Sequence, residues 1–210
     1  MLLLLFDYIG TLAFAISGAL KGVRSGMDVF GVAVLATVTA IGGGTIRDAL
    51  LDLPIFWLRN STYVLISVAG ALTVFLFFRL VERTERVLLV FDAIGLGVFT
   101  AIGAMKAADA HLTIVGVVTM GLLTGIGGGV IRDLLSREVP VVLREEVYAS
   151  ASIAGGLVYA LLTRVEVIQT VAVGAAIAVT IVIRLMSIWF GWHLPRLAAT
   201  TDGADTRDTG

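Results

Sequence analysis

The segment Ile41-Gly42-Gly43-Gly44-Thr45-Ile46-Arg47-Asp48 returns, with one change, as Ile126-Gly127-Gly128-Gly129-Val130-Ile131-Arg132-Asp133. The shift that carries Ile41 onto Ile126 also pairs further charged and polar positions, namely Asp7 with Asp92, Lys21 with Lys106, Thr39 with Thr124 and Tyr63 with Tyr148. A composition rich in Gly, Ala and Leu does not explain charged and aromatic matches in a single register. The chain therefore contains two related halves, at about residues 3–80 and 88–165.

The composition indicates a membrane protein that crosses the bilayer several times. Of its 210 residues, 58% are hydrophobic and only 15% are charged, and the mean hydropathy is +1.01. A soluble domain is closer to half apolar and a quarter charged. Because there is no cysteine and there are only two histidines, we expect no disulfide framework, no metal site and no bound cofactor. The net charge of −1 gives no basic field for nucleic acid.

Seven apolar stretches can be read along the chain, and a spanning helix needs about 20 residues. They are 2–20, 29–50, 62–78, 87–105, 112–135, 147–162 and 167–186. Each half holds three of them, and because three is odd the second half enters the membrane from the opposite side. The predicted fold is an all-α membrane protein of seven transmembrane helices, arranged as two inverted three-helix repeats plus a seventh helix at about 167–188. Residues 1–196 form one transmembrane domain, and 197–210 form a polar, disordered tail.

The distribution of arginine predicts the orientation in the membrane. When the loops are assigned alternately to the two sides, the side that holds the C-terminus receives most of the arginines, among them Arg79, Arg83 and Arg86. The positive-inside rule then places the N-terminus outside and the C-terminus in the cytoplasm.

The two triple-glycine segments lie inside the second and fifth spans. Three consecutive glycines cost about 3 kcal/mol of helix propensity relative to alanine, so a kink or a short unwound stretch is expected at Gly42–Gly44 and at Gly127–Gly129. Irregular backbone at membrane depth is tolerated inside protein or beside a water-filled cavity. The alternative is close helix packing, since small residues line helix contacts in membranes. Their occurrence at equivalent places in both halves favours a role in a pathway.

Ionisable groups at membrane depth are costly and normally face a partner or a cavity. The candidates for lining or gating a pathway are Lys21, Lys106, Arg47, Arg132, Asp48, Asp133, Thr39 and Thr124. For the lysines the alternative is snorkelling to the headgroups, for the Arg-Asp pairs it is fixing of helix ends, and for the threonines it is hydrogen bonding within the helix. Asp7 and Asp92 either supply negative charge at the two mouths or have a structural role, as a cap at a helix start or as the partner of an arginine. No signature of an enzyme is present: the sequence offers no nucleophile beside a base, no metal-binding histidine spacing and no phosphate-binding loop.

With these features the sequence resembles the prokaryotic trimeric intracellular cation (TRIC) channels. The doubled Gly-Gly-Gly-x-Ile-Arg-Asp segments at 42–48 and 127–133, the three-plus-three-plus-one arrangement, and Lys21 with Lys106 carry the resemblance over about residues 3–188. It implies a homotrimer in the inner membrane, with one pore in each protomer lined by kinked second and fifth helices. The implied permeant ions are potassium and some sodium, and the surrounding partner is membrane lipid.

Positive side chains beside a cation pathway repel the permeant ions. We expect Asp48 and Asp133 to neutralise the arginines, and Lys21 and Lys106 to act as a gate. The same family is linked to movement of small amino acids such as glycine, and an inverted repeat also suits a carrier that works by alternating access. A membrane scaffold without transport is a third hypothesis, and the duplicated polar motif at depth counts against it.

Overall fold

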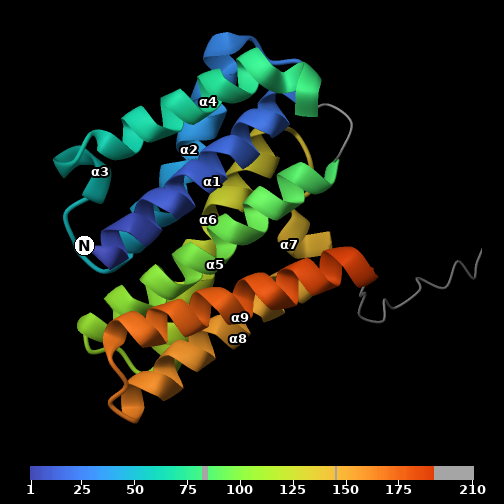
Figure 1. The fold of residues 1–210 in the computed structure, drawn as a ribbon. Coiled ribbons are helices and arrows are strands. Elements are labelled where there is room, and N and C mark those ends of the chain that lie inside the picture. Colours follow the sequence, from blue (N-terminus) through green and yellow to red (C-terminus); the bar gives the residue numbers. More distant parts are fainter. Residues whose placement is uncertain (82–84, 145, 192–210) are drawn as a thin grey trace, which may run out of the picture.

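The computed structural model describes residues 1–81, 85–144 and 146–191, and within them the fold is entirely helical. Seven helices have 19 to 25 residues and two have four (Figure 1). They are α1 (Leu2–Arg24), α2 (Val29–Leu50), α3 (Phe56–Arg59), α4 (Thr62–Val81), α5 (Glu85–Asp109), α6 (Ile114–Leu135), α7 (Val141–Arg144), α8 (Glu146–Arg164) and α9 (Gln169–Phe190). The predicted tail at 197–210 lies outside the described residues.

The sequence repeat is also a structural repeat. The shift that relates the two glycine motifs carries both bounds of α2 onto those of α6, and both bounds of α3 onto those of α7. The starts of α2 and α6 are fixed in the same way: the Asp28 side chain accepts a hydrogen bond from Gly31 N at 2.7 Å, and the Thr113 side chain accepts one from Gly116 N at 3.3 Å. Such N-caps satisfy a backbone donor that has no partner within the helix.

The two halves are inverted relative to each other. Figure 1 shows α1 and α5, which are equivalent in the repeat, running in opposite directions side by side. Contacts between the halves are reciprocal, as they are across a two-fold axis. Phe14 stacks on its own equivalent, Phe99, with ring centroids 5.3 Å apart. An approximate two-fold axis therefore passes through the contact of α1 with α5.

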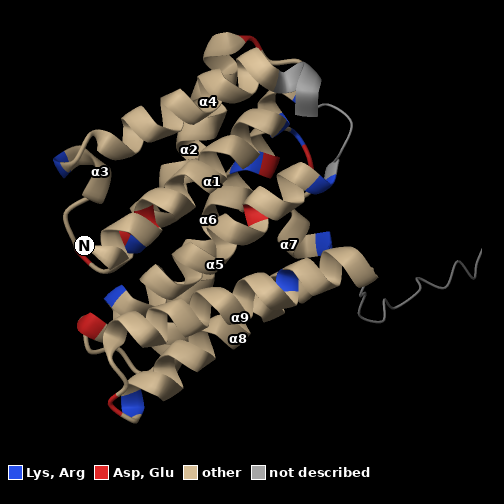
Figure 2. Cartoon of the chain, in the orientation of Figure 1, with Lys and Arg blue, Asp and Glu red and all other residues tan. Residues whose placement is uncertain are grey.

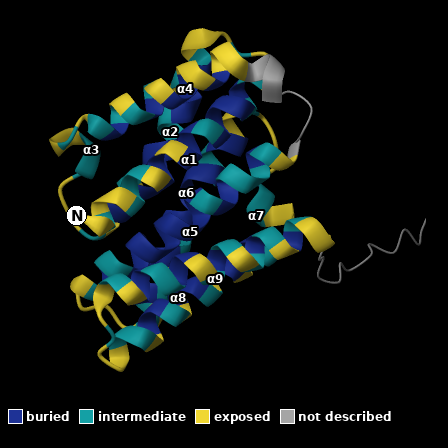
Figure 3. Ribbon diagram, viewed as in Figure 1, coloured by how far each residue is buried: buried dark blue, intermediate teal, exposed yellow. Residues whose placement is uncertain are grey.

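The helices bury small residues and expose large apolar ones. Alanine, glycine and threonine occupy much of the interior, whereas the outer faces of α4, α8 and α9 carry exposed leucine, valine and phenylalanine (Figure 3). This is the pattern of a protein whose surroundings are apolar. The seventh long helix, α9, packs against α5 and α8 of the second half.

Five of the described helices are long and apolar enough to cross a membrane: 2–24, 29–50, 86–109, 114–135 and 169–190. In α4 the described apolar stretch, Thr62–Phe77, is shorter, and α8 does not meet the same criteria. The prediction of seven spans therefore stays a prediction at these two helices. α2 and α6 continue as helix through their glycines, so the unwound stretch considered as an alternative is absent. The predicted kink stays a prediction.

Candidate functional site

The two Arg-Asp pairs have the same local geometry in both halves. Arg47 Nε donates to Asp48 Oδ1 at 2.8 Å, and Arg132 Nε donates to Asp133 Oδ1, also at 2.8 Å. A second guanidinium nitrogen lies 2.7 Å from the same oxygen in the first pair and 2.8 Å in the second. All four side chains are buried, so each charge is compensated where water cannot screen it.

The other carboxylate oxygen of each aspartate holds the chain that follows the helix. Asp48 Oδ2 accepts a hydrogen bond from Phe56 N at 3.0 Å, and Asp133 Oδ2 accepts one from Val141 N at 3.0 Å. These donors are the first residues of the short helices α3 and α7, where backbone N–H groups lack partners within the helix. Each aspartate thus connects a long helix to the short helix that follows it.

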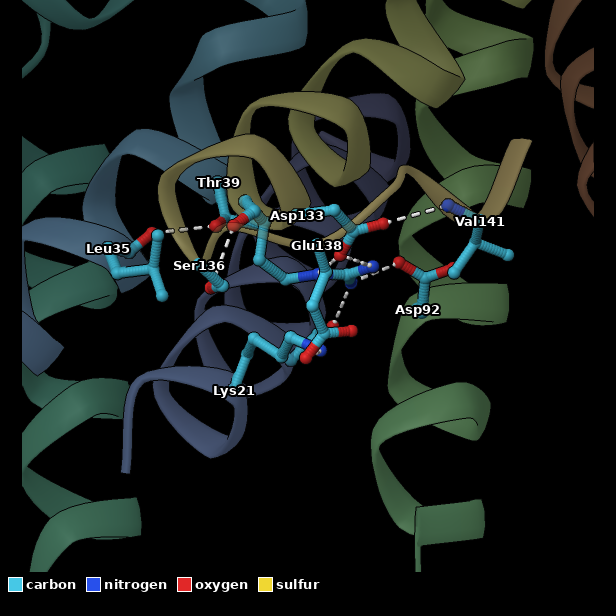
Figure 4. A network of polar contacts seen from close by, with 10 residues as sticks. Lys21, Leu35, Thr39, Asp92, Asp133, Ser136, Glu138 and Val141 are labelled. Atoms are coloured by element: carbon cyan, nitrogen blue, oxygen red, sulfur yellow. Dashed lines mark hydrogen bonds and ion pairs between the residues drawn. The ribbon is translucent and has the colours of Figure 1, made fainter. Parts of the chain in front are cut away.

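In the second half the arginine is the centre of a larger network, drawn in Figure 4. Arg132 Nη1 lies 2.5 Å from Asp92 Oδ1 on α5 and 2.6 Å from Ser17 Oγ on α1. Arg132, Asp92 and Ser17 are at most 1% exposed. Three helices from both halves therefore meet at one guanidinium group. Of the two hypotheses for Asp92, the structure favours pairing with an arginine over an open mouth.

The first half has a different network. Tyr63 Oη donates to Asp7 Oδ2 at 2.7 Å, whereas Arg47 lies over the Phe56 ring, 5.5 Å from its centroid. Arg47 and Lys106 lie within electrostatic range of Asp7. Among the described residues, no ion pair within 4 Å is found for Asp7 or Lys106. The equivalent aspartates therefore have different partners.

The glycines lie where α2 crosses α6. A Cβ atom built on Gly43 would lie 2.2 Å from Thr124 O, and one built on Gly128 would lie 2.2 Å from Thr39 O. Exchange of the halves converts one contact into the other, so the two-fold axis also passes through this crossing. The close helix packing considered for the glycines is therefore present at Gly43 and Gly128.

The two threonines bond within their own helices. Thr39 Oγ1 donates to Leu35 O and Thr124 Oγ1 donates to Met120 O, both at 2.6 Å. Both threonines are fully buried. A Cβ on Gly18 or Gly103 would lie within 2.6 Å of these hydroxyl oxygens, so the threonines pack closely against α1 and α5.

A cavity of about 620 Å³ opens beside the network of the second half. Its lining comes from the end of α1, the start of α5, the end of α6 and the chain that follows α6. The lining residues are Lys21, Arg24, Ser25, Leu88, Leu89, Arg132, Asp133, Ser136, Glu138, Val139, Val141 and Arg144. Lys21 Nζ lies 2.6 Å from Glu138 Oε1. The lysine side chain is 15% exposed and the glutamate side chain 49%. The structure thus brings Lys21 together with Arg132 and Asp133 at one cavity.

Tyr63, Tyr148 and Glu138 were not among the predicted site residues. Tyr63 and Tyr148 match in the repeat, and that signal would have found them. Tyr148 lies under Arg184 of α9, with 4.9 Å from the guanidinium carbon to the ring centroid. Glu138 has no such signal, because the repeat places Leu53 at the equivalent position. In the described part of the chain no group of three His, Asp or Glu side chains is arranged to hold a metal ion.

The charges in the interior are few and grouped. Figure 2 shows the Lys, Arg, Asp and Glu residues along α1, α2, α5, α6 and α9 as small patches in a helical bundle that is otherwise mostly uncharged. Buried charged residues in a membrane protein normally mark a transport pathway or a structural pair. The arrangement suits an ion or small zwitterion that passes beside paired charges.

Comparisons with known proteins identify the family. A family model described as "Glycine transporter" matches residues 4–79 and again residues 89–164, in the register of the internal repeat. One solved structure, of a TRIC cation channel studied for its conductance, is 40% identical in sequence to this chain. The two structures superpose with a TM-score of 0.85, over 93% of this chain and 97% of the channel chain. The chain belongs to the TRIC channel family. The TRIC orthologue from Rhodobacter sphaeroides is 35% identical, with a TM-score of 0.87 over 91% of this chain and 99% of that one.

Membership of the TRIC family also agrees with the curated relatives. The UPF0126 inner membrane protein YadS of Escherichia coli is 42% identical over 97% of this chain and 100% of its own length. The chain therefore spans the whole of this relative, and the repeat, the Arg-Asp pairs and α9 all lie in the matched region.

Proposed function

We propose that this protein is a passive channel for monovalent cations, permeable to potassium and sodium, in a prokaryotic inner membrane. We further propose that it is a homotrimer with one pore in each protomer. The observation that carries this proposal is its likeness to solved TRIC cation channels, at 40% identity over 93% of the chain. No reaction chemistry is proposed, because channels move ions without changing covalent bonds.

The paired charges support a cation pathway. An isolated arginine beside the path would repel a cation, and at membrane depth this repulsion is only weakly screened. Arg47 is paired with Asp48, Arg132 with Asp133 and Asp92, and Lys21 with Glu138. These pairs remove most of the repulsion that the positive side chains alone would create.

We place the pathway along the crossing of α2 and α6. Its proposed lining comprises Lys21, Lys106, Arg47, Arg132, Asp48, Asp133, Thr39 and Thr124, with the kinks at Gly42–Gly44 and Gly127–Gly129. In the described conformation the backbones are in contact at Gly43 and Gly128. Conduction then requires α2 and α6 to separate there, with Lys21 and Lys106 acting as gating charges.

We propose that the N-terminus lies outside and the C-terminus in the cytoplasm. The cavity at the end of α1 then faces the cytoplasm. Arg86, at the start of α5, lies on the same side, where anionic lipid headgroups attract positive charge.

The test is a planar bilayer recording from purified protein under a potassium chloride gradient. Discrete unitary currents that reverse close to the potassium equilibrium potential are expected. Silence in the bilayer, together with saturable uptake of labelled glycine into liposomes from the same preparation, would replace the channel by a carrier. That alternative is favoured only by the description of the matching family model.

A further inference from the structure

We infer that Glu138 raises the preference of the cavity beside α1 and α6 for cations over anions. The inference rests on the proposed channel function and adds to it a residue that sets selectivity. It concerns one mouth of the pathway, because the repeat places Leu53 at the other.

The backbone presents Glu138 and Leu53 in the same way. Leu53 N donates to Asp48 O at 2.8 Å, and Glu138 N donates to Asp133 O at 2.9 Å. The preceding residues, Asp52 and Arg137, have φ angles of 52° and 59°. The two helix ends are therefore equivalent turns, and the difference between the mouths lies in the side chains that they carry.

A second difference accompanies the first. The repeat pairs Ser17, which binds Arg132, with Ile102, which is buried among apolar neighbours. Ser17 is fully buried behind the cavity and bonds to Arg132, which lines it, whereas Glu138 lines the 620 Å³ cavity directly. Of the two changes, the carboxylate of Glu138 is the one that can meet a hydrated ion in the cavity.

Among the residues that line the cavity, the carboxylate of Glu138 is the one expected to control the ratio of cation to anion permeability. Four of its residues are positive, Lys21, Arg24, Arg132 and Arg144, and two are negative, Asp133 and Glu138. Asp133 accepts two guanidinium contacts from Arg132, so its charge is already directed at that group. Loss of Glu138 would remove the partner of Lys21 and expose the lysine charge to the permeant ion.

The size of the effect follows from Coulomb's law. A unit charge about 7 Å from an ion in water changes the local concentration of that ion about 2.7-fold, and it acts in opposite directions on potassium and chloride. The ratio of potassium to chloride permeability then changes about sevenfold without screening. At 0.15 M salt, with a Debye length of about 8 Å, the change falls to about twofold.

The experiment measures this ratio from reversal potentials in potassium chloride gradients at low and at physiological ionic strength. Reversal potentials do not depend on how often the channel opens, so effects on gating do not enter. The variants are Glu138→Gln, Glu138→Asp and the double variant Lys21→Gln with Glu138→Gln. The matched control is Glu166→Gln, which removes one negative charge from the turn between α8 and α9. Size-exclusion chromatography confirms that each variant is folded.

The expected result is a ratio that falls about sevenfold in dilute salt for Glu138→Gln and stays near the wild-type value for Glu138→Asp and Glu166→Gln. The double variant restores the net charge of the lining, so its ratio should return towards the wild-type value. An unchanged ratio in Glu138→Gln, or a double variant as impaired as the single one, would overturn the inference while the channel function stands. Silence of the wild-type protein would instead overturn the channel function and this inference with it.

Discussion

Replacement of Gly43 by alanine tests how tightly α2 and α6 are packed. The added Cβ would lie 2.2 Å from Thr124 O, whereas ordinary van der Waals contact begins near 3.4 Å. The obstacle is a backbone oxygen within α6, so no side-chain rotation can relieve the contact. The two helices must therefore move apart at their crossing until that distance reaches the ordinary range.

Two opposing contributions set the change in the free energy of unfolding for Gly43→Ala. Overpacking of a tight interior costs about 1–3 kcal/mol, and a clash with backbone belongs near the upper end. The change from glycine to alanine within a helix returns about 1 kcal/mol of helix propensity. The net loss is about 2 kcal/mol, which for a chain of this size lowers the melting temperature by about 4–8 °C.

The assay is thermal unfolding in detergent, followed by the fluorescence of the three tryptophans. Gly174→Ala is the matched control, because Gly174 lies within α9 and a Cβ there meets nothing within 4 Å. It should raise the melting temperature by about 2–4 °C, since only the propensity gain of about 1 kcal/mol remains.

Equal melting temperatures for Gly43→Ala and the wild type would refute the close crossing. So would an equal loss in the control variant. Bilayer recordings of Gly43→Ala separate packing from a pathway role: if ions pass where the helices separate, the variant should also change unitary conductance or open probability. If conduction is unchanged while stability falls, Gly43 serves packing alone.

Three further predictions concern charge along the proposed pathway. Lys106→Ala should change unitary conductance or open probability in bilayer recordings while leaving the melting temperature nearly unchanged, because Lys106 has no ion pair within 4 Å among the described residues; unaltered single-channel records would remove this lysine from the mechanism. Asp48→Ala should lower the free energy of unfolding by about 3–5 kcal/mol, because it leaves Arg47 buried without its carboxylate partner. Asp133→Ala should lower it less, because Arg132 keeps the carboxylate of Asp92. Equal losses of stability for the two variants in detergent unfolding would contradict this. Leu53→Glu should raise the potassium-to-chloride permeability ratio about twofold at 0.15 M salt, and Leu53→Gln is its uncharged control.

The helices could be predicted well because long apolar stretches are separated by charged breaks. The expected stretch 29–50 coincides with α2, and 112–135 differs from α6 by two residues at its start. There the Thr113 side chain fixes the first turn. The short helices α3 and α7 were not predicted. Four residues carry no periodicity, and their first N–H groups are held by aspartates eight residues earlier in the chain.

The Arg-Asp pairs could be singled out from the sequence, but their long-range partners could not. The duplicated motif singled out the arginines and aspartates, and their pairing with the next residue is local. The contacts of Arg132 with Asp92 and Ser17 span 40 and 115 residues, and no spacing in a single sequence encodes them. The repeat also predicts equal surroundings for Asp7 and Asp92, yet one binds a tyrosine and the other an arginine.

The inverted repeat separates what holds the fold from what distinguishes the two mouths. Gly43 and Gly128, and the bond of each arginine to the next aspartate, make the same contacts twice around the two-fold axis. A change at one of them would have to be accommodated at the crossing of both halves. Positions that differ, such as Glu138 and Leu53, lie at the ends of the helices, where one mouth can change without the other. Selectivity is therefore expected to reside in the unpaired differences, and structural integrity in the duplicated residues.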